Sequence, residues 1–499
     1  MDLLTHHPLG TRIPDSVHAV CACLPTLADV IGYEEKDPRV MGRLDLGYPR
    51  FVQHLDLRRA VEHLRRRHGW EGRDVFLTAS EGAARRLVEY AVPHGAAIEA
   101  REGFSLVHFP SNAKAAVRAR LFLQHTGCGL SSRQAEDLLL GEGLLPSRQQ
   151  EETVAGDAAA VCVEMMRSLS GAASREEVFL CRSGMNAFHA TFLALQEAQA
   201  ARGRDLWLQV GWLYLDTQRI LEKFTAAPSS ILWLHDPSDQ DVIEDAFARH
   251  GARIAGVVTE TPTNPLVQTG NIPRLAELSR KYGAALVLDP SAVGLANVDV
   301  LPHADALVSS LTKYASNRGD VMAGLAVVNR SSPFAGDLFL GLTKYVEPLD
   351  PRDAARLAWV VRDMEEVSRA GSENTGRLAE WLGGHPAVRR VHWAGSPCYR
   401  KNYEALARGP GRWGALLSVE LKRPLAEVYD RLRVVKAPSF GVRFTMACPF
   451  VYLTHYERVC DEAGQRWLRE RGLEPDLLRI SPGIEPFDRI RDVFEEALG

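Results

Sequence analysis

The stretch LPHADALVSSLTKYASNRGDVMAG, residues 301–324, decides the expected fold and chemistry of this chain. Its lysine, Lys313, follows two hydroxyl side chains, Ser310 and Thr312, and precedes a polar loop that contains glycine. A lysine in such a position is often an ordinary surface residue. The segments around it therefore decide what it does.

The segment upstream gives this lysine a chemical context. The apolar run Ala284–Leu288 predicts a buried parallel strand, and the strand ends in Asp289. A lysine can form a Schiff base with pyridoxal 5′-phosphate (PLP), a carboxylate can pair with its pyridine nitrogen, and hydroxyls can reach its phosphate. The combination predicts a PLP site in which Lys313 forms the Schiff base, Asp289 pairs with the pyridine nitrogen, and Ser310 and Thr312 reach the phosphate.

Length and composition indicate a globular protein of two or three domains. The chain has 499 residues, of which 46% are hydrophobic and 24% charged, and its net charge of −4 gives no reason to expect nucleic acid or an anionic membrane as partner. The cysteines are scattered, with only Cys21 and Cys23 close together, so no zinc site is expected. No run approaches the roughly 20 apolar residues of a membrane span, and no leader is recognisable. We expect a cytoplasmic protein with reduced thiols.

The chain divides into three predicted domains. Residues 156–345 alternate strands with helices, which predicts an α/β fold with a central, mostly parallel, doubly wound sheet that binds PLP. Residues 346–499 predict a smaller C-terminal α/β domain, and residues 1–155 an N-terminal extension. The strands expected in the central domain are 177–180, 206–210, 231–234, 254–258, 284–288 and 323–328, with helices at 186–200 and 272–282.

The two flanking regions have a different order of strands and helices. In the extension we expect an irregular arm over residues 11–51 and then a small α/β module. The helix expected at 55–68 has a strongly basic face, which we interpret as solvated, with a docking face for an acidic partner as the alternative. The other expected elements are strands 74–78, 104–109, 416–421 and 478–481, and helices 113–123, 353–385, 425–432, 457–471 and 487–498.

Two further strand ends carry suitable groups. Ser183-Gly184-Met185 follows a strand and opens a helix, so its backbone N–H groups can cradle a phosphate. Asn264 follows another strand and can reach the phenolic oxygen of the cofactor. Because ligands of open parallel sheets bind at the carboxyl ends of strands, these groups are expected to converge with Asp289 and Lys313.

These segments resemble the Cys/Met-metabolism group of fold-type-I PLP-dependent enzymes. The matching segments are SGMNAFHA (183–190), YLDT (214–217), ETPTNP (260–265), SSLTKYASNRGD (309–320), ENTGRLAEWLGGHPAVRRVHW (373–393), KAPSFGV (436–442) and LLRISPGIEP (477–486). The first 155 residues resemble the extension of the longer, fungal-type cystathionine γ-synthases. The segments that carry this second resemblance are 13–35, GYPRF (47–51) and 121–136.

The resemblance implies roles on the cofactor side. Lys313 would shuttle protons between Cα, Cβ and Cγ, and Asp289 would keep the pyridine nitrogen protonated. Tyr214 would stack on the cofactor ring, with a core aromatic as the alternative. The phosphate would be held by Ser183, Gly184, Met185, Ser310 and Thr312, and the phenolic oxygen by Asn264.

The resemblance also implies roles on the substrate and subunit sides. Arg479 would clamp the substrate α-carboxylate through a bidentate pair, and Ser439 would lie near both Lys313 and that carboxylate. In the family, a Tyr-x-Arg segment of one subunit binds phosphate in its neighbour. The match chosen is Ser131-Ser132-Arg133, so Arg133 is a candidate, with a solvated arginine at a helix start as the alternative.

Several segments depart from the family pattern and leave the substrate open. Asp289-Pro290-Ser291 replaces Asp-Asn-Thr, Leu215-Asp216 replaces Gly-Gly, and Ser316-Asn317-Arg318 replaces Gly-Gly-His. These differences line the expected cofactor and substrate cleft.

The first functional hypothesis is γ-replacement. An activated homoserine (O-acyl- or O-phospho-) and a thiol such as cysteine would give cystathionine through a vinylglycine-type intermediate. The alternatives are γ-elimination to 2-oxobutyrate and ammonia, γ-replacement with an unusual nucleophile in secondary metabolism, or loss of catalysis in a binding subunit. The resemblance implies a homo-oligomer, a dimer or dimer of dimers, with active sites at subunit interfaces and the arm of the N-terminal extension contributing to the neighbouring subunit.

Overall fold

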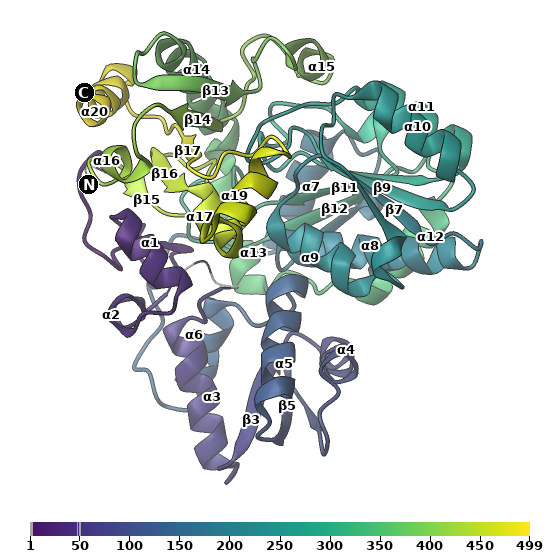
Figure 1. Ribbon diagram of the computed structural model, residues 1–499. Coiled ribbons are helices and arrows are strands. Elements are labelled where there is room, and N and C mark those ends of the chain that lie inside the picture. Colours follow the sequence, from purple (N-terminus) through teal and green to yellow (C-terminus); the bar gives the residue numbers. More distant parts are fainter. Residues whose placement is uncertain (1–2, 47, 49–50) are drawn as a thin grey trace.

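The sheet of the central region forms from short, almost fully apolar runs. The computed structural model describes residues 3–46, 48 and 51–499, and its largest sheet has seven strands in the order β6-β12-β11-β10-β9-β7-β8 (Figure 1). All neighbouring pairs are parallel except those of β12, which is antiparallel to both β11 and β6. The predicted α/β class with a mostly parallel sheet is confirmed. The strands are β6 (Val178–Cys181), β7 (Leu206–Val210), β8 (Ile231–Leu234), β9 (Ile254–Glu260), β10 (Ala285–Asp289), β11 (Ala306–Ser310) and β12 (Gly324–Val328).

Helices cover both faces of this sheet, so its core strands are buried on two sides. One apolar cluster joins α8 (Gly184–Ala200), α9 (Leu215–Phe224) and α12 (Ala335–Tyr345) to one face. Another joins α7 (Ala158–Ser170), α10 (Gln240–His250), α11 (Ile272–Tyr282) and α13 (Pro351–Val360) to the other. Two-sided burial explains why the strands read as continuous apolar runs. β11 was not among the predicted strands, because its two serines interrupt that pattern.

The C-terminal region builds a second, mostly antiparallel sheet. Its five strands lie in the order β13-β14-β17-β16-β15, flanked by α14 (Met364–Gly383), α16 (Leu425–Tyr429) and α20 (Phe487–Leu498). The strands are β13 (Val388–Trp393), β14 (Leu417–Leu421), β15 (Val435–Lys436), β16 (Met446–Pro449) and β17 (Leu478–Ser481). The single helix predicted over 457–471 was wrong. The chain forms α18 (Tyr456–Val459) and α19 (Glu462–Arg469), because the Asp461 side chain accepts the N–H of Gly464 and starts a new helix.

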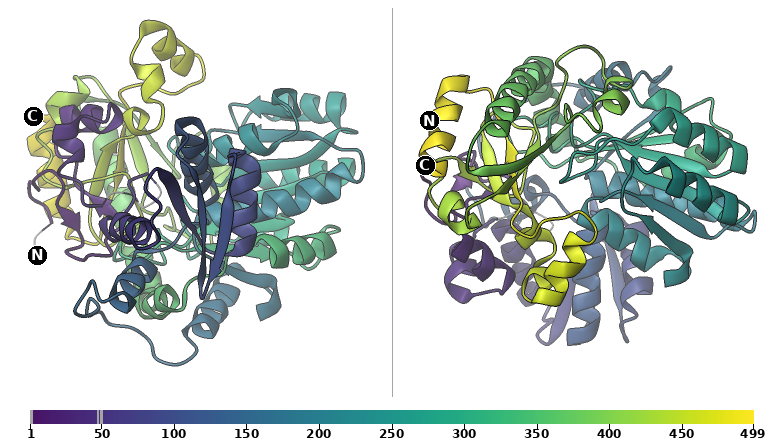
Figure 2. Two further views of the ribbon diagram at one scale, coloured as in Figure 1. Left: turned by 90° about the horizontal axis from the view of Figure 1, so that it is seen from below. Right: turned by 45° about the horizontal axis from the view of Figure 1, so that its top comes forward.

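The extension contributes a third sheet, in the order β3-β5-β4. We call residues 55–141 the N-terminal module. It contains α3 (Leu55–Arg67), β3 (Arg73–Thr78), α4 (Glu81–Ala91), β4 (Ala97–Arg101), β5 (Phe104–Pro110), α5 (Ala113–Thr126) and α6 (Ser132–Gly141). In Figure 1 it lies below both larger sheets, with α5 reaching up toward α9, and Figure 2 shows the same arrangement from two other sides.

The arm that precedes the module is more regular than predicted. Residues 11–51 include β1 (Arg12–Ile13), β2 (Cys21–Ala22), α1 (Leu27–Glu34) and α2 (Pro38–Met41). A reciprocal capping box between Thr26 and Asp29 starts α1, a signal that sequence reasoning overlooked. Val30 and other apolar residues of the arm share a core with the C-terminal sheet. Among the described residues, no helix is long and apolar enough to cross a membrane.

The two leucines of α12 provide a test of which face supports the core. Leu338 is fully buried, whereas 76% of Leu340 is exposed. We expect Leu338→Ala to lower the free energy of unfolding by about 2–5 kcal/mol, because it leaves a cavity beside the central sheet. Leu340→Ala should change it by less than about 0.5 kcal/mol. Denaturant unfolding of both variants measures the difference, and equal effects would contradict the assigned packing.

Candidate active site

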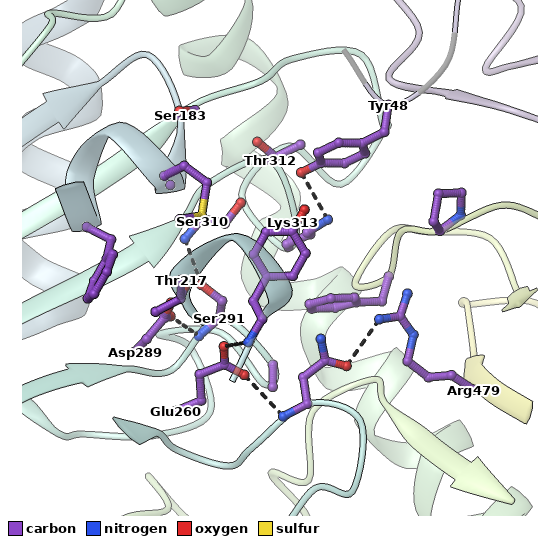
Figure 3. A pocket seen from close by; sticks show the side chains of 18 residues that line it. Tyr48, Ser183, Thr217, Glu260, Asp289, Ser291, Ser310, Thr312, Lys313 and Arg479 are labelled. Atoms are coloured by element: carbon purple, nitrogen blue, oxygen red, sulfur yellow. Dashed lines mark hydrogen bonds between the residues drawn. The ribbon is translucent and has the colours of Figure 1, made fainter. Parts of the chain in front are cut away.

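A cavity opens where the carboxyl ends of β9, β10 and β11 meet the start of α8 (Figure 3). The C-terminal sheet and the N-terminal arm close its remaining sides. The lining residues are Tyr48, Ser183, Gly184, Met185, Phe188, Tyr214, Thr217, Glu260, Asn264, Asp289, Ser291, Ala292, Ser310, Thr312, Lys313, Pro438, Phe440 and Arg479. The structure thus brings together ten of the predicted site residues. Ser439 adjoins the cavity through its contact with Lys313, and Arg133 is not part of it.

Lys313 is a buried amine held by neutral groups. Its Nζ donates to Tyr48 Oη and to Ser439 Oγ, both at 3.2 Å. The rings of Tyr48 and Phe440 lie 4.6 and 4.8 Å from the same atom. Among the described residues, no carboxylate forms an ion pair with it. A desolvated amine without a counter-ion is suited to bond formation with an aldehyde.

Two carboxyl groups, Glu260 buried and Asp289 partly exposed, lie side by side at the strand ends. Asp289 of β10 is opposite Glu260 of β9 in the parallel register. Asp289 lines the cavity and is otherwise enclosed by protein. Burial raises its pKa to about 6, although hydrogen bonds from Ser291 act in the other direction. Burial, and then the charge of Asp289, raise the pKa of Glu260 well above its ordinary value. A ring nitrogen that carries a proton would relieve this unpaired negative charge.

Glu260 is a site residue that the sequence analysis missed. Its two oxygens accept the backbone N–H groups of Tyr214, at 2.5 Å, and Asn264, at 3.1 Å. It therefore fixes the two segments that carry the predicted ring-stacking and phenol-binding residues. Its place at the end of a predicted strand, four residues before Asn264, was the available signal.

The start of α8 forms a cradle, because the first backbone N–H groups of a helix have no partner within the helix. Ser183 is the N-cap residue, and its Oγ accepts the N–H of Asn186 at 3.0 Å. Gly184 packs so closely against β11 that a Cβ there would lie 2.9 Å from the Cα of Ser310. Helix starts of this kind bind phosphate. The Thr312 hydroxyl, by contrast, donates to the carbonyl oxygen of Ala323 at 3.2 Å. This hydrogen bond stabilises the loop between these two residues.

Arg479 of β17 closes the substrate side. It is 4% exposed, and its guanidinium donates to Asn264 Oδ1 at 3.1 Å and to the carbonyl oxygen of Ser439 at 3.2 Å. Phe440 and Phe450 lie against it at 5.1 and 4.7 Å. No carboxylate in the described part of the chain pairs with it. The arginine therefore retains the capacity to bind the carboxylate of an amino acid.

Tyr48 is a second residue that the sequence analysis missed. It reaches the cavity from the arm of the same chain and contacts Lys313. The signal was present in the sequence, because Tyr48-Pro49-Arg50 has the Tyr-x-Arg spacing that was assigned instead to the segment around Arg133. Pro49 and Arg50 lie outside the described residues.

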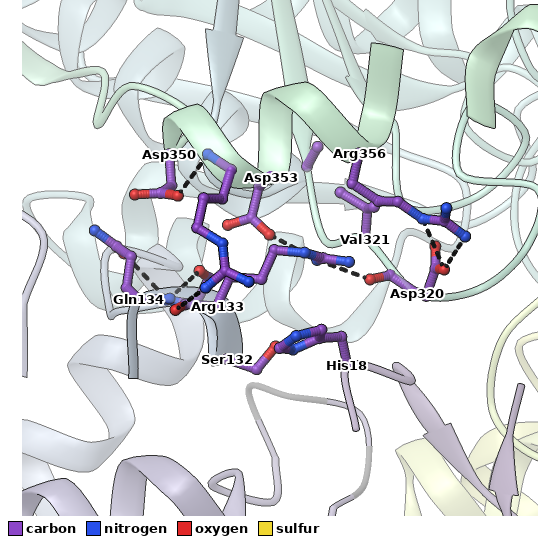
Figure 4. A network of polar contacts seen from close by, with 12 residues as sticks. His18, Ser132, Arg133, Gln134, Asp320, Val321, Asp350, Asp353 and Arg356 are labelled. Carbon is purple, nitrogen blue, oxygen red and sulfur yellow. Dashed lines mark hydrogen bonds and ion pairs between the residues drawn. The ribbon is translucent and has the colours of Figure 1, made fainter. Parts of the chain in front are cut away.

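Arg133 does not fit its predicted role. The guanidinium is 1% exposed and donates to Glu151 at 2.6 and 2.8 Å, to Asp353 at 2.8 Å and to the carbonyl oxygen of Asp320 at 3.0 Å (Figure 4). Its donors are used within its own chain, so it has none to offer a neighbouring subunit's phosphate. The alternative of a solvated arginine was wrong as well, because the residue joins the module to the loop after Lys313.

The residues present fit PLP, and together with the sheet they define a fold-type-I PLP-dependent enzyme. The buried amine matches the aldehyde of this cofactor, and the two adjacent carboxyl groups match its ring nitrogen. The cradle at Gly184 matches its phosphate. Residues 158–499 match the family model described as Cys/Met metabolism PLP-dependent enzyme. The chain belongs to this PLP-dependent family.

Full-length relatives extend the comparison to the N-terminal region. The chain is 38% identical to the L-2-amino-4-chloropent-4-enoate dechlorinase/desaturase of Streptantibioticus cattleyicolor, over 97% of both proteins. It is 26% identical to the cystathionine γ-synthase of Neurospora crassa, over 98% of both. The solved cystathionine γ-synthase of Xanthomonas oryzae pv. oryzae shares the fold, with a TM-score of 0.58 and 24% identity over 70% of this chain and 88% of that one.

The raised pKa of Asp289 predicts that the free energy of unfolding of the PLP-free protein depends on pH. Because the folded pKa is about 6 and the ordinary value is 3.8, wild type loses stability relative to Asp289→Asn as the pH rises through this interval. At pH 8 we expect the PLP-free variant to be more stable than wild type by about 1–3 kcal/mol, and near pH 4 the two should converge. Denaturant unfolding across this range measures it. A less stable variant at pH 8 would show that the Ser291 hydrogen bonds outweigh burial.

The corrected position of Arg133 predicts a structural effect. Arg133→Ala leaves Asp353 buried without its cation and leaves Glu151 only the longer contacts, at 3.9 Å, to Arg352 and Arg356. The free energy of unfolding should fall by about 3–5 kcal/mol. Arg66→Ala, which removes an exposed helix ion pair, is the control and should cost less than about 0.5 kcal/mol. A folded Arg133 variant that keeps wild-type stability but binds PLP weakly would restore the phosphate role.

Proposed function

We propose that this enzyme removes a leaving group from Cγ of a small, neutral amino acid. The observation that carries the proposal is the charge of the cavity: Arg479 is the one guanidinium among its described lining residues. One such group anchors one α-carboxylate. A second amino acid, such as the cysteine of a γ-replacement, would need another anchor. The dechlorinase/desaturase at 38% identity supports elimination as well.

The substrate is proposed to lie between Arg479 and Lys313. Arg479 binds the α-carboxylate, and Asn264, which accepts one of its N–H groups, orients the guanidinium. Ser439 connects both ends, because its carbonyl accepts from Arg479 and its hydroxyl accepts from Lys313. This arrangement places the Cα–H of the substrate toward the amine.

The reaction then depends on proton transfers by Lys313. Bound PLP supplies an electron sink that acidifies the hydrogen on Cα. In our proposal the Lys313 amine would take this proton and release it to the bound cofactor, and the neutral amine would then take a proton from Cβ. The group on Cγ would leave with the electron pair of its bond. Tyr48 and Ser439 hold the amine, and the rings of Tyr48 and Phe440 keep water from it. Asp289 is proposed to hold the ring nitrogen, and Tyr214 the ring face.

The surroundings of the amine favour a small leaving group of low polarity. Met185, Phe188, Pro438 and Phe440 contribute apolar surface to the cavity. The name of the dechlorinase/desaturase places chlorine on C4 of its substrate, which is Cγ. We therefore infer that this chain acts on an amino acid of four or five carbons with a halide or an acyl ester at Cγ.

Cystathionine formation is the second candidate. The Neurospora crassa cystathionine γ-synthase aligns over 98% of both chains, including the extension. Replacement and elimination share every step up to departure of the leaving group. They differ in whether a thiol then enters. We carry the predicted dimer or dimer of dimers forward as a proposal, which light scattering of the purified enzyme tests.

Product analysis by mass spectrometry separates the candidates. Enzyme with PLP is offered 2-amino-4-chloropent-4-enoate and acetyl-, succinyl- and phospho-homoserine, each with and without cysteine. We expect the leaving group to be lost at the same rate without cysteine, with the product an unsaturated amino acid or a 2-oxo acid plus ammonia. Lys313→Ala is the control and should give no product. Cystathionine that forms only when cysteine is present would overturn the proposal in favour of replacement.

A further inference from the structure

The last turn of α5, in the N-terminal module, contacts the segment that carries Tyr214. His125 is 3% exposed, and its Nδ1 lies 2.9 Å from Oδ1 of Asp216. Its Nε2 lies 2.7 Å from Nζ of Lys223. An ammonium group can only donate, so Nε2 accepts and Nδ1 carries the hydrogen that is donated to Asp216. Both nitrogens of this histidine are therefore used, and its tautomer is fixed.

Asp216 transmits this contact to the cofactor site. It is fully buried in the first turn of α9, two residues after Tyr214, which is the N-cap residue of that helix. On its other side, the N–H of Tyr214 is held by Glu260. The start of α9 is thus fixed from the sheet by one carboxyl group and from the N-terminal module by another. The family pattern of Gly-Gly, replaced here by Leu215-Asp216, offers a histidine no carboxylate.

The surroundings make this hydrogen bond hard to replace. Beyond it, Phe224 of α9 packs against Tyr90 and Phe122 of the module, with ring centroids 5.4 and 6.3 Å away, and against His189 of α8 at 4.8 Å. His125 and Asp216 are themselves 3% and 0% exposed, so water has little access to the hydrogen bond between them. Loss of the His125 donor is therefore costly for the buried carboxylate.

The same turn also contacts the phosphate cradle. Gly127, two residues after His125, ends α5 with φ of +61°. A Cβ at this position would lie 1.9 Å from Oγ of Ser183, and the Gly127 carbonyl lies 3.4 Å from that oxygen. Two residues of the module, His125 and Gly127, therefore contact both walls of the site, at Asp216 and at Ser183.

We propose that His125 is a positioning residue for the cofactor site. By holding Asp216 it sets the start of α9, and with it the ring of Tyr214 against the cofactor. The N-terminal module is then part of the scaffold of the site. The inference rests on the proposed placement of PLP against Tyr214, but it does not depend on which reaction the enzyme catalyses.

Cofactor binding is the measurement that tests it. His125→Leu removes both hydrogen bonds at similar volume, whereas His125→Asn retains an N–H close to the position of Nδ1. PLP is titrated into the PLP-free proteins, and the circular dichroism of the bound cofactor is recorded in the visible range. We expect His125→Leu to weaken PLP binding at least tenfold and to change the visible signal, and His125→Asn to restore most of both.

A histidine–carboxylate pair between His63 of the module and Glu142, which directly follows it, provides the control. His63 Nε2 lies 3.0 Å from Glu142 Oε2, and neither residue lines the cavity. His63→Leu should leave PLP affinity and the visible signal unchanged. Wild-type affinity and signal in His125→Leu would overturn the proposal. So would an equal loss in His63→Leu, or no recovery in His125→Asn.

A second variant covers the case in which His125→Leu does not fold. Asp216→Asn keeps the size of the side chain and removes the charge that His125 contacts. It should weaken PLP binding in the same direction, because it acts on the same contact. Unchanged PLP affinity in Asp216→Asn would contradict the proposal. Since no substrate is involved, failure here is separate from failure of the elimination assay.

Discussion

The site depends on a buried amine that no carboxylate of the described residues neutralises. Moving an ammonium group out of water is costly unless it is paired. Around Lys313 the protein supplies two hydroxyl groups and two aromatic faces instead. Tyr48 comes from the arm, whereas Ser439 and Phe440 come from the C-terminal region. Three parts of the chain must therefore converge before the amine has its environment.

The opposite charge is concentrated at the far end of the cavity. Asp289 and Glu260 are adjacent on parallel strands, and burial raises the pKa of both. A carboxylate in this position destabilises the protein until a cation pairs with it. Cofactor binding is thus expected to relieve strain that the folded chain carries. Separating the amine from the carboxyl pair leaves room for a ring between them.

Part of this site could be predicted from the sequence, because some of its residues directly follow strands that the local pattern reveals. Lys313 and Asp289 follow apolar strands of one sheet, and parallel strands bring their carboxyl ends to a common edge. Tyr48 and His125 could not be placed this way, because they lie on irregular or helical segments whose position depends on tertiary packing. Arg133 failed for the same reason: its spacing to a serine says nothing about which carboxylates surround it in the fold.

The origin of Tyr48 changes what a second subunit has to contribute. In the resemblance that guided the sequence analysis, the Tyr-x-Arg segment comes from a neighbouring subunit. Here Tyr48 contacts Lys313 of its own chain, at 3.2 Å. This contact to the amine is therefore made within one chain. The arm, which the resemblance assigned to the site of a neighbouring subunit, thus contributes to the site of its own chain.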